Sequence, residues 1–249
     1  MGESLTVLVP SSPEDAVRLF GDGGGVTVVG GGTIVIPNLS LGRRSAGRAL
    51  LLHRAGLAGV RRDGGRITIG ATTTLDALAD LPEPLRTAAA HVADVEIRGQ
   101  ATIGGNICAE GTDAPRGDLQ GALIALGAQV RSTGAGGERT EAISDFLPDR
   151  QDRLVLDISF DEPAAGAFAF LDRPHTHDYT ALAVSVARLR DGTVRIGVTG
   201  AGPHGLLLAS PDDTDALPFA DDALASAWYR RRTLPVLVRR ALAELGESA

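Results

Sequence analysis

Two glycine-rich segments carry the residues best suited to holding a ligand. Glu96–Asp118 contains the pentapeptide Thr102-Ile103-Gly104-Gly105-Asn106, and Val26–Pro37 contains Gly30-Gly31-Gly32-Thr33-Ile34. Thr102 and Ile103 are expected to be extended, with a turn at Gly104-Gly105 that lets a ligand approach the main chain. Successive N–H groups in such turns form a concavity suited to an anion. Each segment alone predicts a simple turn, but together they predict two contacts with one long phosphate-containing ligand.

Other reactive residues do not form a recognisable catalytic set. Gly200–Gly205 matches GxGxxG after a predicted strand, but Pro203 intervenes and too little chain follows for a βαβ unit, so we reject a dinucleotide site there. His175 and His177 lack a third metal ligand at a recognisable spacing, and surface histidines are the more frequent case. Cys108 has no patterned histidine and is expected to be a small buried side chain. Ligand-binding loops without acid–base residues suit a protein whose bound cofactor does the chemistry.

The composition is that of an ordinary globular chain. Hydrophobic residues make up 43% and charged residues 22% of the 249 positions, which predicts one or two domains. All 24 basic residues are arginines scattered along the sequence, and the net charge of −7 argues against a nucleic-acid surface. A single cysteine excludes an internal disulfide and a cysteine-rich metal site within this chain. No signal peptide or long apolar run is visible, so we expect a cytoplasmic protein without a membrane span.

The elements around the two glycine segments predict an α+β fold. A strand at 5–9, a helix at 13–20 and a strand at 26–29 lead to the first segment. A hairpin around Gly64-Gly65 and a long helix over 83–95 precede the second. After the second segment we expect a short helix ending at Gly127, strands at 129–131 and 153–160, a hairpin around Asp191-Gly192, and an amphipathic helix over 234–245.

A domain boundary is predicted at Asp161-Glu162-Pro163, where the strand pattern ends. Residues 1–162 would form the larger domain, with two lobes at 1–55 and 56–162. Residues 163–249 would form a smaller domain of antiparallel sheet and helices.

The order of these motifs resembles the FAD-binding medium subunits of the molybdenum hydroxylases, the family of carbon monoxide dehydrogenase and xanthine dehydrogenase. Gly30–Ile34 stands at the family's first flavin loop, and Thr102–Asn106 is the most specific element. The resemblance covers nearly the whole chain. Further matching positions are Ala71-Thr72-Thr73, Ile97-Arg98, Pro115–Asp118, Asp178-Tyr179, Tyr229–Arg231 and Arg240–Leu242.

The resemblance implies a two-lobed FAD-binding domain of the p-cresol methylhydroxylase/vanillyl-alcohol oxidase (PCMH/VAO) type and a small C-terminal α+β domain. Asp118 would bind a sugar or ring-edge group of FAD, with Asp113 as the alternative acid. Tyr179 would cover the isoalloxazine ring, and Arg98 and Arg173 are candidate charges at its edge. The pyrophosphate and ribityl chain would lie against Gly30, Gly31, Gly32, Thr33, Ile34, Thr102, Ile103, Gly104, Gly105 and Asn106. Two positions depart from the family: Ile34 replaces a polar residue and Ala101 replaces a glycine.

The implied function is electron transfer by an FAD-dependent oxidoreductase subunit. The implied partners are an iron–sulfur small subunit and a molybdopterin large subunit, in a heterotrimer that is single or paired. Substrate would be oxidised on a partner chain, and electrons would leave to NAD, a quinone or oxygen. Two alternatives remain open: a stand-alone flavin oxidoreductase and a flavin-free structural subunit of the same fold. A bound-flavin spectrum separates the last from the others, and neighbouring genes for the two partners separate the complex from the stand-alone enzyme.

Overall fold

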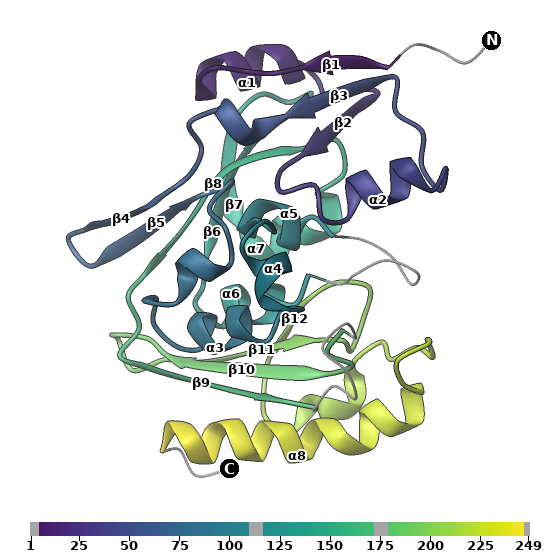
Figure 1. Ribbon diagram of the computed structural model, residues 1–249. Helices are drawn as coiled ribbons and strands as arrows, with labels where there is room; N and C mark the ends of the chain where they lie inside the picture. Colours follow the sequence, from purple (N-terminus) through teal and green to yellow (C-terminus); the bar gives the residue numbers. More distant parts are fainter. Residues whose placement is uncertain (1–4, 110–116, 172–178, 247–249) are drawn as a thin grey trace.

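The computed structural model describes residues 5–109, 117–171 and 179–246. Three β-sheets succeed one another along the molecule, so that the first strand and the last helix lie at opposite ends (Figure 1). The mixture of helices with one parallel and two antiparallel sheets is the predicted α+β architecture. None of the helices in the described ranges is both long and apolar enough to cross a membrane.

The first sheet is parallel, with the order β1-β3-β2. Helix α1 packs on it through Ala16 and Phe20, and Ser12 caps this helix by accepting the N–H of Asp15 at 3.1 Å. The sequence did not predict helix α2, which begins directly after Ile34 and buries none of its residues. The elements are β1 (Thr6–Leu8), α1 (Pro13–Phe20), β2 (Val26–Val29), α2 (Val35–Ser40), β3 (Arg48–Leu51) and the 3₁₀ turn η1 (Leu52–Arg54).

The second sheet is antiparallel, with the order β4-β5-β8-β6-β7. The predicted hairpin around Gly64-Gly65 is confirmed, since Asp63 pairs with Arg66. The central strand β8 pairs with both β5 and β6, and therefore joins the hairpin to the rest of the sheet. The strands are β4 (Val60–Asp63), β5 (Arg66–Gly70), β6 (Gln129–Thr133), β7 (Arg139–Ala142) and β8 (Leu154–Asp161).

Short helices pack beside the second sheet. The long helix predicted over 83–95 is wrong, because Ala93 has a φ of 44° and interrupts it. Asp94 then caps a separate helix by accepting the N–H of Ile97 at 2.8 Å. The elements are η2 (Asp76–Leu78), α3 (Leu85–Ala90), α4 (Val95–Arg98), α5 (Ile103–Ile107), α6 (Gln120–Ala125), α7 (Ile143–Phe146) and η3 (Leu147–Asp149).

The third sheet is antiparallel, with the order β12-β11-β10-β9, and it lies between α6 and the long helix α8 (Figure 1). The predicted hairpin around Asp191-Gly192 is confirmed, since Arg188 pairs with Val194. Helix α8 begins at Ala227 rather than at the predicted Leu234. The elements are β9 (Ala165–Phe170), β10 (Ala183–Arg188), β11 (Val194–Thr199), β12 (Leu206–Leu208), η4 (Asp213–Ala216) and α8 (Ala227–Leu245).

One hydrophobic core joins the second and third sheets. Leu123 and Phe160 pack in the same cluster as Phe168 of β9, so apolar contacts cross residue 162. Helix α6 approaches β11 so closely that a Cβ at Gly197 would lie 1.9 Å from the carbonyl oxygen of Gly121. The third sheet is therefore packed directly onto the body that carries the second glycine segment.

Candidate cofactor site

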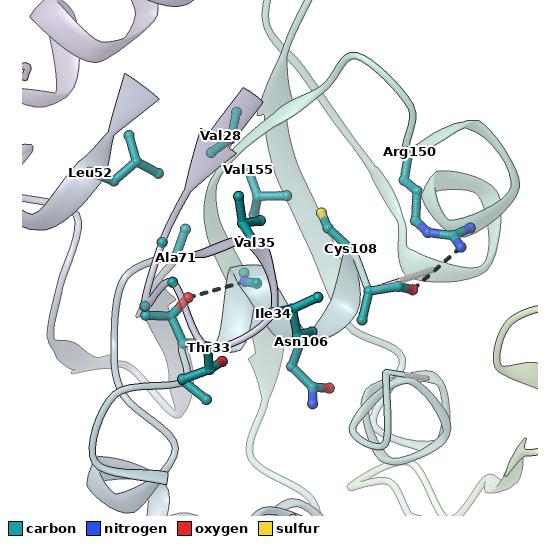
Figure 2. Close-up of a pocket in the computed structure, with 18 of the residues that line it drawn as sticks. Val28, Thr33, Ile34, Val35, Leu52, Ala71, Asn106, Cys108, Arg150 and Val155 are labelled. Atoms are coloured by element: carbon teal, nitrogen blue, oxygen red, sulfur yellow. Dashed lines mark hydrogen bonds between the residues drawn. The ribbon is translucent and has the colours of Figure 1, made fainter. Parts of the chain in front are cut away.

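A cavity of about 510 Å³ is lined by both glycine segments (Figure 2). The structure brings together all the predicted site residues except Ile103, whose side chain is buried in the core. Those that line the cavity are Gly30, Gly31, Gly32, Thr33, Ile34, Thr102, Gly104, Gly105, Asn106, Asp118 and Tyr179.

The first glycine segment lies directly on the start of the second. A Cβ at Gly31 would lie 1.8 Å from the carbonyl oxygen of Gln100, and a Cβ at Gly30 would lie 2.6 Å from Oγ1 of Thr102. Packing therefore requires glycine at both positions. Within the described part of the chain, the backbone N–H groups of Gly31, Gly32, Thr33 and Ile34 have no protein acceptor, so these successive donors remain available to an anion.

In the second segment Thr102 is extended, as expected, but the residues after it form helix α5 (Ile103–Ile107) instead of the expected extended Ile103 and turn at Gly104-Gly105. Thr102 caps α5 by accepting the N–H of Gly105 on Oγ1 at 3.2 Å. The N–H groups of Ile103 and Gly104 donate to the carbonyl oxygens of Thr73 and Ala71, each at 2.9 Å. These N–H groups already have acceptors within the protein, so they are not available to an anion. Of the two segments, only the loop Gly31–Ile34 offers successive free backbone donors among the described residues.

Two buried amide side chains tie α5 to α6 and to the third sheet. Oδ1 of Asn106 accepts the N–H of Leu119 at 3.0 Å. Gln120 donates from Nε2 to the carbonyl oxygen of Ile107 at 2.8 Å and accepts the N–H of Gly205 at 2.6 Å. Gly205 ends the GxGxxG stretch, which joins β11 to β12 without opening a helix, as expected from its rejection as a dinucleotide site. These bonds fix the backbone on both sides of Asp118.

Asp118 and Tyr179 bring a carboxylate and a phenol to the cavity. Asp118 is buried, whereas Tyr179 is half-buried. Burial raises the pKa of Tyr179 above its ordinary value of 10.0, and the negative charge of Asp118 raises it further. Several residues considered above lie outside the described ranges: Asp113, Pro115, Arg116, Arg173, His175, His177 and Asp178.

Three arginines that the sequence analysis did not single out also line the cavity. Arg150 donates to the carbonyl oxygen of Ala109 at 3.5 Å (Figure 2), and Arg153 donates to Oγ of Ser132 at 2.7 Å. Arg44 reaches the cavity from the exposed segment between α2 and β3. Arg150 and Arg153 belong to the charged run 149–153, a signal that sequence reading could have used. Cys108 also lines the cavity and is partly exposed, rather than buried as expected.

Two non-glycine residues with left-handed backbone lie in the cavity wall. They are Ala93, with a φ of 44°, and Asp152, with a φ of 52°, and no other described non-glycine residue has a positive φ. Such conformations cost on the order of 1 kcal/mol and persist where the surroundings enforce them. Arg98 donates to the carbonyl oxygens of Val92 and Ala93 at 2.9 and 2.8 Å. Arg98 is not a lining residue, so its role is to hold this wall rather than to place a charge at a ring edge.

The donor set fits a long anionic cofactor such as FAD. Free N–H groups on the first loop suit a pyrophosphate, and Arg44, Arg150 and Arg153 supply positive charge to the same cavity.

Comparison with known proteins agrees with this chemistry. The model of a family described as the FAD binding domain in molybdopterin dehydrogenase matches residues 3–160. The 6-hydroxypseudooxynicotine dehydrogenase complex subunit alpha of Paenarthrobacter nicotinovorans is 28% identical, over 97% of this chain and 94% of that protein. The carbon monoxide dehydrogenase medium chain of Afipia carboxidovorans is 29% identical, over 94% of this chain and 93% of that protein. A chain of reconstituted CO dehydrogenase from Oligotropha carboxidovorans superimposes with a TM-score of 0.83 at 25% identity, covering 98% of both chains. The chain therefore belongs to the family of FAD-binding domains of molybdopterin dehydrogenases, and it is an FAD-binding oxidoreductase subunit of the molybdenum hydroxylase type.

Proposed function

We propose that the cavity between the two glycine segments holds FAD, with the pyrophosphate against Gly31–Ile34. The observation that carries this assignment is the run of successive backbone donors, free of protein acceptors, on a loop that packs onto α5. Gly30 brings the loop against Thr102. The wall behind the loop consists of Thr102, Gly104, Gly105 and Asn106, and Ile103 anchors it in the core.

The far wall is assigned to the sugar and ring portions of the cofactor. Asp118 would accept a hydrogen bond from a hydroxyl or ring N–H group, and Tyr179 would cover the isoalloxazine. Arg44, Arg150 and Arg153 would offset the phosphate charge. These residues bind and orient the cofactor and exclude water, and none of them is assigned as a catalytic side chain.

The function we propose is electron transfer within a complex. When bound, FAD supplies a relay for electrons from an iron–sulfur small subunit, itself reduced by a molybdopterin large subunit, to NAD, a quinone or oxygen. The relatives support a complex, since one is named a complex subunit and the other a medium chain. We propose residues 1–162 as the FAD-binding domain, with lobes at 1–55 and 56–162, and residues 163–249 as the C-terminal domain packed against it through the shared core.

An FAD titration of the purified, flavin-free chain tests the site assignment. We expect FAD to stay with the protein through gel filtration, and FMN, which lacks the adenylate half, to bind at least about tenfold more weakly. Gly31→Ala should also weaken FAD binding by about tenfold or more, because its methyl group would displace the loop from Gln100.

The matched control is Gly47→Ala in the same lobe, where a Cβ would meet nothing within 4 Å. It should bind FAD like the unaltered chain. Equal FAD binding by the Gly31 and Gly47 variants would contradict the role of the loop. Absence of flavin from both the isolated chain and its co-purified complex would contradict the cofactor site itself.

A further inference from the structure

Arg230 of helix α8 is the one arginine among the described residues whose side chain is wholly buried. A buried guanidinium needs a counter-charge and acceptors for its donors. Asp222 supplies the counter-charge, since its Oδ1 lies 2.6 Å from Nη2 of Arg230. Nη1 donates to the carbonyl oxygens of Ala220 and Ala225 at 2.7 and 2.8 Å. These contacts fix the segment 220–225, which leads into α8.

The third nitrogen of the Arg230 guanidinium binds a different part of the chain. Nε donates to the carbonyl oxygen of Ala181 at 3.0 Å. Ala181 comes two residues after Tyr179, and Thr180 between them is buried. One side chain of α8 therefore reaches across to the backbone that carries the tyrosine in the cavity wall.

The carbonyl of Ala181 is confined from a second direction. A Cβ at Gly200 would lie 2.3 Å from its oxygen, and Gly200 has a φ of 93°. Only glycine can occupy this position without moving Ala181. Gly200 begins the GxGxxG stretch that does not serve as a dinucleotide site, so this glycine has a packing role instead.

We propose that Arg230 is a positioning residue for the cofactor cavity: through the Ala181 carbonyl it fixes Tyr179 in the wall that covers the bound flavin. This inference rests on the FAD site proposed above. The nitrogens of the guanidinium then have different roles. Nη1 and Nη2 hold the segment that leads into α8, and Nε holds the backbone next to Tyr179.

The geometry explains why arginine is required. The guanidinium presents donors in a rigid fork, so one side chain can bind two segments that lie in different directions. A lysine has its donors on a single nitrogen at the end of a flexible chain. Arg230→Lys can keep the ion pair with Asp222 but cannot also hold Ala181. It should therefore preserve the fold and release Tyr179.

The test is a double-mutant cycle with Arg230→Lys and Tyr179→Ala, read as the dissociation constant for FAD and as the free energy of unfolding. With Tyr179 present, Arg230→Lys should weaken FAD binding by about tenfold, the loss of one well-placed aromatic contact. With Tyr179→Ala it should have no further effect on FAD, while its effect on unfolding stays the same in both backgrounds. An equal loss of FAD affinity in both backgrounds, or no loss, would overturn the proposal.

A second measurement follows the tyrosine without any cofactor. In a Tyr229→Phe background Tyr179 is the one remaining tyrosine, and Arg230→Lys should lower its pKa toward the ordinary value because burial is lost. An unchanged titration would overturn the positioning role even if FAD binds. If the chain binds no FAD but Arg230→Lys still lowers the pKa of Tyr179, the proposed FAD site is contradicted, whereas the role of Arg230 in positioning Tyr179 is supported.

Arg231→Lys is the control. This neighbour lies over the ring of Phe219 and donates to the carbonyl oxygen of Asp215, with no contact to Ala181. Its FAD affinity and tyrosine titration should match those of the unaltered chain. Arg230→Gln combined with Asp222→Asn, which removes both charges of the buried pair, repeats the cycle if the buried lysine prevents folding.

Discussion

Tyr179 and Asp118 are the two cavity residues whose mutual influence can be followed by titration. Burial is the larger cause of the raised pKa of Tyr179, and the charge of Asp118 is the smaller. Asp118→Asn should therefore lower the pKa of Tyr179 while leaving it above 10.0. Phenolate absorbance against pH, in the Tyr229→Phe background, measures the shift. An identical curve for the Asn variant would show that the two groups do not interact.

The same shift fixes the sign of a stability effect. The pKa of Tyr179 is higher in the folded state than in the unfolded state, so the neutral phenol stabilises the folded state. This contribution is complete at pH values below the unfolded pKa of about 10. That contribution is lost as the pH rises through the folded pKa. Asp118→Asn should make the loss smaller, since the two pKa values lie closer together.

At this scale the sequence predicts glycines better than charged residues. Gly30 and Gly31 can be recognised from the sequence because packing permits no other residue there, and this requirement appears in the sequence as a glycine motif. Arg44 leaves none, and Arg150 leaves only the charged run 149–153, which does not by itself distinguish a cavity arginine from a surface one. Ile103 shows the reverse case: it belongs to the motif but lies in the core with Ile107, because residues four apart share one face of a helix.

Helix α5 depends on the cap at its first turn. Thr102→Val should cost about 1 kcal/mol of unfolding free energy, because the N–H of Gly105 loses its acceptor at Oγ1. Thr102→Ser keeps the hydroxyl and should recover most of the loss. Chemical denaturation of the three proteins measures both changes. A Val variant as stable as the unaltered chain would contradict the contribution of the cap, and a loss on Thr102→Ser would measure the packing of the methyl group that Val retains.

The elements that the sequence misplaced were decided by tertiary contacts or by proline. Gly104-Gly105 predicts a turn on propensity, but the acceptors Ala71 and Thr73 lie in a distant segment that sequence spacing does not reveal. Helix α8 runs through Pro235 and therefore begins before the expected Leu234, with Ser226 as its cap. The hairpins around Gly64-Gly65 and Asp191-Gly192 were predictable because turn chemistry is local.

Because the second and third sheets share one hydrophobic core, a single added methyl group between them should lower the stability of the whole molecule. Gly197→Ala would place a Cβ 1.9 Å from the carbonyl oxygen of Gly121, which should force β11 away from α6 and destabilise the chain by about 3 kcal/mol. Gly136→Ala, where a Cβ meets nothing within 4 Å, is the matched control. Thermal unfolding followed by two probes checks the result.

We expect one coincident transition in the unaltered chain, because the apolar cluster spans Ile67 to Ala187. Two separate transitions there would show that the segments on either side of residue 162 fold independently. In that case Gly197→Ala should lower only one of them.

Helix α8 is made on the ribosome after every other described element, and its Arg230 holds the last wall of a cavity whose first loop begins at residue 30. A nascent chain can thus display the complete glycine loop while its tyrosine wall still has no anchor. With Arg230 positioning Tyr179 as proposed above, full flavin affinity should therefore be reached only once α8 has been synthesised. A chain that stops before α8 would keep both glycine motifs, yet it should bind the cofactor more weakly than the chain that includes Arg230.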